Sequence, residues 1–315
     1  MVRLGVASLL FIVAACSTSE ARTPPPSGAP VPTAHTSPSS APVAAPIAEA
    51  PLLPVSAVYP WRPSATAESD RLDGRFRAPP AGFERVEVPR GSFGEFLRTL
   101  PLQPEGAPVV DFRGNKLHDD GRHPNIVAVA DLDIGRKDLQ HCADAILRLH
   151  AEWRYGRGDR DLVYRTVSGQ PLSYRAFLAG DRAVVEGKSL SMRRSSPPHV
   201  DDHPFFRGWL DEVFAWAGTA SLERDGKKVA SVSEMMPGDF FVMSGTPFGH
   251  AVLVLDMARD AAGRVALLLG QSYMPAQSFQ ILASQGSPWF VVEPGDASVS
   301  TPMWRPFPIS SLRRL

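Results

Sequence analysis

The chain has little cysteine, no excess of either charge and no long apolar run. It contains only two cysteines among 315 residues, at positions 16 and 142. Lys+Arg and Asp+Glu both number 33, without a block of like charges, which argues against a nucleic-acid partner. No stretch is long enough to span a bilayer as a helix, and no glycine-rich phosphate-binding loop is present. We expect no cofactor and no metal ion.

The N-terminus has the pattern of an export signal. Arg3 precedes a short apolar segment, residues 9–15, which ends at Cys16 and is followed by Ser17. The segment is too short to cross a membrane and has the shape of a secretory h-region. An ordinary signal peptide needs no cysteine at its end, so two interpretations stand: a lipid-modified protein, or a secreted protein with a chance cysteine.

The run Val-Ala-Ala-Cys at residues 13–16 resembles the lipobox of bacterial lipoproteins. That resemblance implies removal of the signal peptide at residues 1–15 and acylation of the Cys16 thiol. The lipid bilayer would then be a partner through the acylated Cys16, and the protein would be lipid-anchored and extracytoplasmic. Ser17, rather than Asp, implies the outer membrane in this class.

The next segment has the composition of a tether. From Ser17 to about Tyr59 the chain is mainly Pro, Ala, Ser and Thr, with few charges. Such a segment cannot bury enough apolar surface to offset its ordering entropy, and repeated prolines favour an extended spacer. We therefore expect a lipidated, disordered tether at residues 16–58 and one folded domain at residues 59–315.

The clearest helical period begins at Asp138, a plausible N-cap, and runs to Trp153. The period places Cys142 in the first turns, on the stripe that faces the core. A helix N-terminus favours a thiolate, so Cys142 is either a reactive nucleophile or a buried, inert filler. If Cys16 is acylated, Cys142 has no partner for an intramolecular disulfide.

Three short strands are expected further along the chain, as an antiparallel meander. They cover residues 240–243, residues 250–256 and residues 265–271, with a hairpin turn at 259–264. A turn centred near residues 260–262 places the partner of His250 between Gln271 and Tyr273. The Gln271 amide oxygen could accept a hydrogen bond from the His250 imidazole and fix its tautomer.

A helix-borne Cys, then Pro237-Gly238-Asp239 with an apolar strand, then Gly249-His250 opening the next strand, resembles the NlpC-type branch of papain-like cysteine peptidases. The resemblance implies an α+β, papain-like fold with the Cys-bearing helix packed on an antiparallel sheet. It also implies Cys142 as nucleophile, His250 as base and Gln271 as the residue that orients the base. Two features depart from that branch: a large insertion separates Cys from His, and Ala143-Asp144 stands where Ser-Gly is usual.

A second resemblance covers nearly all of the expected domain. Its motifs are Gln-His-Cys-Ala-Asp-Ala at 140–145, segments at 174–182 and 218–222, and above all Gly-Gln-Ser-Tyr-Met-Pro-Ala-Gln at 270–277. They resemble an uncharacterised bacterial family, domain of unknown function 4846. This resemblance implies no established activity.

Other polar clusters were considered for binding. Asp201 and Asp202 could recognise a cationic substrate group, and Tyr273 could contact substrate beside His250. The run from His199 to His203 has metal-ligand residue types, but a loop after two prolines does not guarantee convergent ligands, so a polar loop is the preferred interpretation. Asp131 and Asp133 follow an apolar strand at 126–130 and are expected to cap and solvate its end rather than act as an acid pair.

Two functions remain open from the sequence. The first is an envelope-anchored cysteine hydrolase that cleaves amide bonds, with peptidoglycan or another peptide as the possible substrate. The second is a catalytically silent envelope or cell-wall binding module on the same fold. Thiol reactivity separates them, because a silent module should have an ordinary, inert Cys142, whereas a nucleophile should have a pKa well below 8.5.

Overall fold

A computed structural model describes residues 58–62, 67, 70–187 and 189–315. Cys16, the signal peptide and the expected tether up to residue 57 lie outside the described residues. The described residues fall within one compact unit. Tyr59, where the folded domain was expected to begin, is buried and donates a hydrogen bond to the backbone oxygen of Phe96.

The described residues form a mixed α+β structure. Six α-helices are present in this part of the chain: α1 (Leu72–Arg75), α2 (Phe93–Arg98), α3 (Cys142–Gly156), α4 (Tyr174–Leu178), α5 (His203–Trp216) and α6 (Thr219–Asp225). Two short 3-10 helices are η2 (Val232–Glu234) and η3 (Ile309–Ser311). The α+β class expected from the sequence is confirmed.

The main sheet has nine strands, and every strand pair in it is antiparallel. Its strands are β1 (Glu84–Arg85), β2 (Ile126–Val129), β7 (Lys227–Lys228), β8 (Phe240–Met243), β9 (His250–Arg259), β10 (Val265–Gln271), β11 (Gln280–Leu282), β12 (Trp289–Val292) and β15 (Leu312–Arg314). The order is β2-β11-β10-β9-β8-β15-β7, and β1 and β12 pair with β9 and β10 outside that path. The predicted β8-β9-β10 meander is confirmed.

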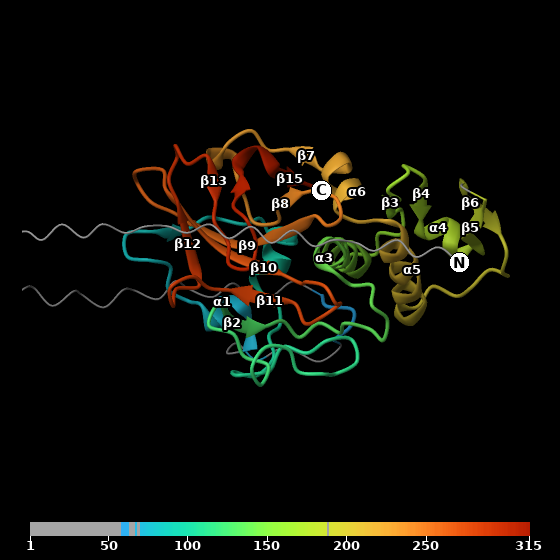
Figure 1. Ribbon diagram of the computed structural model, residues 1–315, viewed down its shortest axis with the longest axis horizontal. Helices are drawn as coiled ribbons and strands as arrows, with labels where there is room; N and C mark the ends of the chain where they lie inside the picture. The colour runs from blue at the N-terminus through green and yellow to red at the C-terminus, as the bar shows by residue number, and fades with distance from the viewer. Residues whose placement is uncertain (1–57, 63–66, 68–69, 188) are drawn as a thin grey trace, which may run out of the picture. The chain divides into compact units, whose positions relative to one another are not determined.

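Three two-stranded sheets stand apart from the main sheet. They pair β3 (Val163–Arg165) with β4 (Pro171–Ser173), β5 (Asp181–Glu186) with β6 (Ser189–Arg194), and β13 (Ser298–Val299) with β14 (Phe307–Pro308). The first two belong to the long segment between Cys142 and His250. Together with α4 and α5 they form a lobe on the side of α3 that faces away from the sheet (Figure 1).

Two apolar cores lie on opposite faces of β9 and β10. One face packs against α3 through residues such as Ala145, Ile146 and Leu149, with Leu253 and Leu268 from the sheet. The other face carries Val252, Val254 and Leu267 from the sheet. Alternating apolar residues on both faces explain why these strands read as continuous hydrophobic runs in the sequence. Helix α3 therefore lies between the sheet and the lobe (Figure 1).

Helix α3 begins three residues later than the sequence pattern indicated. Its N-cap is His141, whose backbone N–H donates to the Asp144 carboxylate at 3.1 Å. The expected cap, Asp138, instead accepts a hydrogen bond from the distant Ala276 N–H at 2.7 Å. Cys142 is consequently the first residue of the helix.

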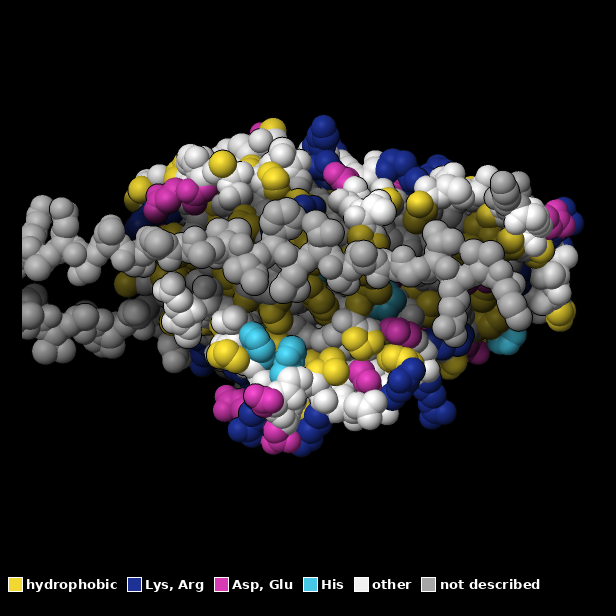
Figure 2. Space-filling view, in the orientation of Figure 1, with side chains coloured by type: hydrophobic (Ala, Val, Ile, Leu, Met, Phe, Trp, Pro, Cys, Tyr) yellow, Lys and Arg dark blue, Asp and Glu magenta, His cyan; other side chains and the backbone are white. Residues whose placement is uncertain are grey.

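Helix α5 buries Trp209 and Phe214, while Trp216 is half-buried. Of the described helices, none is both long and apolar enough to cross a membrane. On the face shown in Figure 2, acidic and basic side chains of the described residues are interspersed with apolar ones. This distribution agrees with the equal numbers of positive and negative residues.

Candidate active site

Cys142 lies at the buried N-terminus of α3. Its side chain is only 6 % exposed, and the backbone amides of Cys142, Ala143 and Ala251 are directed at its sulfur. Ala251 directly follows His250 in β9, so the thiol lies at the end of the strand that carries the histidine. The first N–H groups of a helix have no intrahelical acceptor, so the Cys142 amide can serve an oxyanion.

Burial dominates the electrostatics of the thiol. It raises the pKa of Cys142 to about 11, and the charge of Asp144 acts in the same direction, whereas the three amides lower it. This pKa is the one expected of a buried, inert thiol and not the pKa well below 8.5 expected of a nucleophile. The dipole and amides act against a larger desolvation cost of the thiolate.

His250 opens β9 and is fixed by Gln271, as expected. Its Nε2 lies 2.7 Å from the Gln271 Oε1, and both side chains are buried. With the amide oxygen as acceptor, Nε2 carries the proton, and Nδ1 keeps the lone pair that a base requires. Burial lowers the pKa of His250 to about 4, so the imidazole is neutral at pH 7.

A β-bulge brings these two side chains to one face. Leu268 pairs with Asp256, but Leu269 pairs with Val254, which leaves Leu255 as an extra residue in β9. Continuing the shifted register places Gln271 opposite Val252 and Tyr273 opposite His250. Without the extra residue, period-2 alternation would place Gln271 on the face opposite to His250.

The residue before His250 must be small. A Cβ on Gly249 would collide with the Met243 backbone oxygen and with the Thr219 hydroxyl. The chain therefore enters β9 through a close approach that only glycine permits. This contact helps to fix the position of His250 relative to β8 and α6.

Aromatic rings enclose His250. The rings of Tyr273 and Trp304 each have centroids 4.9 Å from the imidazole, and Phe307 lies 6.1 Å away. Burial raises the pKa of Tyr273, and the charge of a Cys142 thiolate would act in the same direction, so Tyr273 also lies near the sulfur. Thus His250, Gln271 and Tyr273 lie together, on the face of the sheet that carries Val252 rather than on the face that packs against α3. Among the described residues, however, no hydrogen bond joins the Cys142 sulfur to His250, whose ring bonds only to Gln271.

An open cleft of about 580 Å³ adjoins these rings. Tyr273, a loop at residues 245–248 and a loop at residues 303–305 line it. Sequence reasoning missed Trp304 and the two loops. The available signal was Met303-Trp304-Arg305 between two prolines, an aromatic and a cation in a loop rather than on an apolar stripe.

The structure does not bring Asp201 and Asp202 to this site. Asp201 accepts a hydrogen bond from Tyr174 and pairs with Arg160, and it also contacts Tyr155 at the far end of α3. At 1.5 Å per residue, that end lies about 20 Å from Cys142. Asp202 caps α5 by accepting from the Phe205 N–H. Both carboxylates therefore have structural partners in the lobe.

The other polar clusters considered from the sequence also have structural partners. His199 stacks on Phe205, and His203 Nε2 lies 3.0 Å from both oxygens of Glu152. Asp131 pairs with Arg62, and Asp133 with Arg148. In the part of the chain that the structure describes, no group of three or more His, Cys, Asp or Glu side chains could hold a metal ion.

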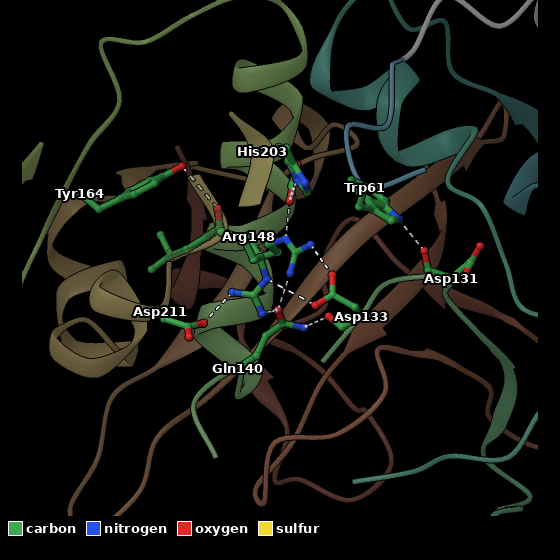
Figure 3. Close-up of polar contacts among 11 residues, drawn as sticks. Trp61, Asp131, Asp133, Gln140, Arg148, Tyr164, His203 and Asp211 are labelled. Carbon is green, nitrogen blue, oxygen red and sulfur yellow. Dashed lines mark hydrogen bonds and ion pairs between the residues drawn. The ribbon is translucent and has the colours of Figure 1, made fainter. Parts of the chain in front are cut away.

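A buried polar network holds the segment before Cys142. Arg148, which is fully buried, donates to Glu152, to the Gln140 Oε1 and to the Asp133 carboxylate (Figure 3). Arg207 of α5 donates to the same Gln140 oxygen at 3.2 Å. The network joins α3 and α5 to the loop that leads into α3, so it fixes where the helix begins.

The comparisons with known proteins identify a family. The model of the family described as "Domain of unknown function (4846)" matches residues 72–314, so the chain belongs to that family. The match spans α1 to the last strand, and Cys142, His250 and Gln271 all lie inside it. Comparisons with curated proteins and with solved structures give no match.

Proposed function

We propose that the protein is a cysteine hydrolase that cleaves amide bonds, on a papain-like domain of the NlpC type. Cys142 is the nucleophile, His250 the general base, and Gln271 the residue that orients the base. The observation that carries the proposal is the His250–Gln271 hydrogen bond at the end of β9 where the thiol lies. It leaves a neutral, buried imidazole with a free lone pair, one residue before the Ala251 amide that lies near the buried thiol.

The reaction would proceed by acyl transfer. As the Cys142 sulfur forms a bond to the substrate carbonyl carbon, His250 Nδ1 takes the thiol proton, and the Cys142 N–H donates to the developing oxyanion. The C–N bond then breaks, and Nδ1 returns the proton to the leaving amine. Water attacks the resulting thioester, its proton passes through Nδ1, and the thiol is regenerated.

With these pKa values, the proposed hydrolase would work by general-base catalysis rather than through a preformed ion pair. A thiol pKa of about 11 and an imidazole pKa of about 4 keep both groups neutral across the physiological range. Proton transfer must therefore accompany attack on the carbonyl. It also requires the ring to approach the sulfur when substrate binds, because no hydrogen bond joins the two groups in the unliganded structure.

Acylation with p-nitrophenyl acetate tests the proposal directly. We expect a burst of p-nitrophenol and an acetylated Cys142 peptide by mass spectrometry, both abolished in Cys142→Ala. His250→Ala should slow acylation about 10²- to 10⁴-fold, the range of a general base, and Gln271→Ala should slow it less. His150→Gln is the matched control, because it removes another buried histidine from a different environment.

One observation favours a second candidate, the catalytically silent envelope or cell-wall binding module. The raised pKa of Cys142 and the missing hydrogen bond to His250 are what an inert, buried thiol would also have. A folded wild-type protein without acylation above the Cys142→Ala background would favour this module over the hydrolase.

The proposed location rests on the lipobox-like sequence. Acylated Cys16 would anchor the protein in the outer membrane, where peptides of the cell wall or its surroundings are the accessible substrates. Cys16→Ala should move the protein from the membrane fraction to the soluble fraction, and globomycin should block processing of the wild type. Membrane retention of the Cys16→Ala protein would contradict the lipid anchor.

A further inference from the structure

The side chains that line the open cleft beside His250 are mainly apolar, and the charge they carry is positive. Phe248 is 59 % exposed on one rim, and Trp304 and Met303 are half-buried on the other. Among the described residues that line the cleft, Arg305 is the only one with a charged side chain, and it is exposed. The cleft therefore presents apolar and aromatic surface together with one positive charge.

Arg305 differs from its neighbours in having no ion pair in the described part of the chain. Arg313 and Arg314, further along the same segment, pair with Glu223 and Asp239. An arginine guanidinium is suited to bidentate contact with a carboxylate. At the cleft, Arg305 makes no such contact with a carboxylate of the described residues.

The groups below the cleft also lack acceptors. Trp304 Nε1 and Gln271 Nε2 are buried donors without a hydrogen-bond partner. Both belong to side chains that contact His250, and none of the described residues that line the cleft has a carboxylate side chain. Buried donors without partners are uncommon in folded proteins, and two of those in the described residues lie beside the imidazole. The surroundings of His250 thus favour a ligand rich in acceptors and of negative charge.

We propose that this cleft binds the carboxylate of an acidic peptide substrate at Arg305, with a large apolar side chain of the same peptide against Phe248 and Trp304. This assignment rests on the proposed hydrolase function and names its substrate class. The volume of about 580 Å³ is within the range of small-ligand sites and suits a short peptide segment. The carboxylate comes from a glutamate or aspartate side chain or from a free peptide C-terminus.

The charge proposed for the substrate group is opposite to the one that the sequence indicated. Asp201 and Asp202 pointed to a cationic substrate group, but both are engaged in the lobe. At the cleft itself, the free charge is positive. A substrate with a cationic group at this position would be repelled by Arg305 and would leave its own positive charge without a partner.

Binding to the full-length Cys142→Ala protein tests the assignment without turnover. Four N-acetylated dipeptides serve as probes: phenylalanyl-glutamate amide, phenylalanyl-glutamine with a free C-terminus, phenylalanyl-glutamine amide and phenylalanyl-lysine amide. Isothermal titration should show at least one of the two carboxylate peptides binding about five- to tenfold tighter than the neutral amide, and the lysine peptide weakest. Which carboxylate peptide binds tighter distinguishes a side-chain acid from a free C-terminus.

Variants of Arg305 locate the preference. In a Cys142→Ala background, Arg305→Gln should abolish it and Arg305→Lys should retain part of it. Arg90→Gln is the control, because Arg90 is an exposed arginine in the turn before α2, away from the cleft. Equal binding of acidic and neutral peptides, a preference that survives Arg305→Gln, or no binding of any probe would overturn the assignment.

The two proposals can fail separately. Hydrolysis is measured with Cys142 intact, and binding is measured with Cys142 absent. A carboxylate preference that depends on Arg305, without any acylation of Cys142, would contradict the hydrolase while supporting the cleft assignment. Acylation of Cys142 without such a preference would support the hydrolase and overturn the assignment.

Discussion

Two buried polar regions flank helix α3, and they differ in how completely their hydrogen bonds are formed. Around Arg148, every nitrogen of the guanidinium has an acceptor, and the Gln140 oxygen accepts from two arginines (Figure 3). Around His250, one hydrogen bond joins the ring to Gln271, while Gln271 Nε2 and Trp304 Nε1 have no partner.

The difference separates a structural role from a functional one. Burying a polar group without a partner costs roughly 1–3 kcal/mol, so a native protein keeps such groups for a reason. The Arg148 guanidinium has all of its hydrogen bonds without any ligand, which is expected of a group that fixes helix packing, although the neighbouring Arg207 Nε lacks a hydrogen-bond partner. The His250 site is incomplete, which is expected of groups that await a substrate.

The largest loss of stability is expected from a substitution of Arg148. Arg148→Met should destabilise the protein by about 3–5 kcal/mol, because it leaves the Glu152 carboxylate buried without its main cationic partner. Urea unfolding followed by circular dichroism measures the change. Arg193→Met, which breaks an exposed ion pair with Glu186, is the control and should cost less than about 1 kcal/mol. Similar losses in the two variants would contradict the contrast.

A smaller loss of stability is expected from the protonation of His250 at low pH. The pKa of His250 is about 4 in the folded protein and about 6.5 in an unfolded chain, so the unfolded state binds more protons between these values. Its contribution to stability is therefore present above pH 6.5 and is lost as the pH falls toward 4. The loss amounts to about 2 kcal/mol at pH 5.

Unfolding measured between pH 7 and pH 5 checks this expectation. The His250→Asn protein should show a flatter fall of the unfolding free energy than the wild type. His150, whose pKa burial lowers to about 3, contributes a similar slope in both proteins. Identical slopes in wild type and variant would show that His250 titrates normally in the folded state.

The smallest effect is expected at Gln271, and a second glutamine provides the matched comparison. Gln271→Leu removes one hydrogen bond to a neutral ring together with one unpartnered donor, so it should cost less than about 1 kcal/mol. Gln140→Leu removes acceptors from two arginines and should cost about 2–3 kcal/mol. Denaturant midpoints of the two variants measure these losses of stability. A larger loss for Gln271→Leu than for Gln140→Leu would contradict the comparison of the two regions.

The sheet was largely predictable because its signal is local. Residues 240–243 and 265–271 are mainly apolar runs between turn residues, and both are strands with the expected bounds. The same local logic identified Cys142, His250 and Gln271 as candidates and gave the His250–Gln271 contact. These features depend on neighbours in the sequence or across one hairpin.

The remainder depends on distant contacts. Asp is a favoured N-cap residue, but the carboxylate of Asp138 accepts a hydrogen bond from the backbone amide of residue 276. Helix α3 therefore begins at Cys142. Asp201 seemed free for substrate because Arg160 and Tyr174 are remote in sequence. The cleft needed two loops separated by more than fifty residues. No local pattern encodes these pairings, so they emerge only from the fold.

The extra residue at Leu255 makes the length of β9 as important as its composition. Deleting one residue there would restore a regular ladder and leave the hydrophobic character of the strand almost unchanged. It would also rotate Gln271 and Tyr273 to the face opposite His250, or force the hairpin to slip. Among relatives of this chain, insertions and deletions should therefore be excluded between His250 and Asp256 more strictly than substitutions. The number of residues in β9, rather than any single side chain, therefore keeps Gln271 and Tyr273 on the same face as His250.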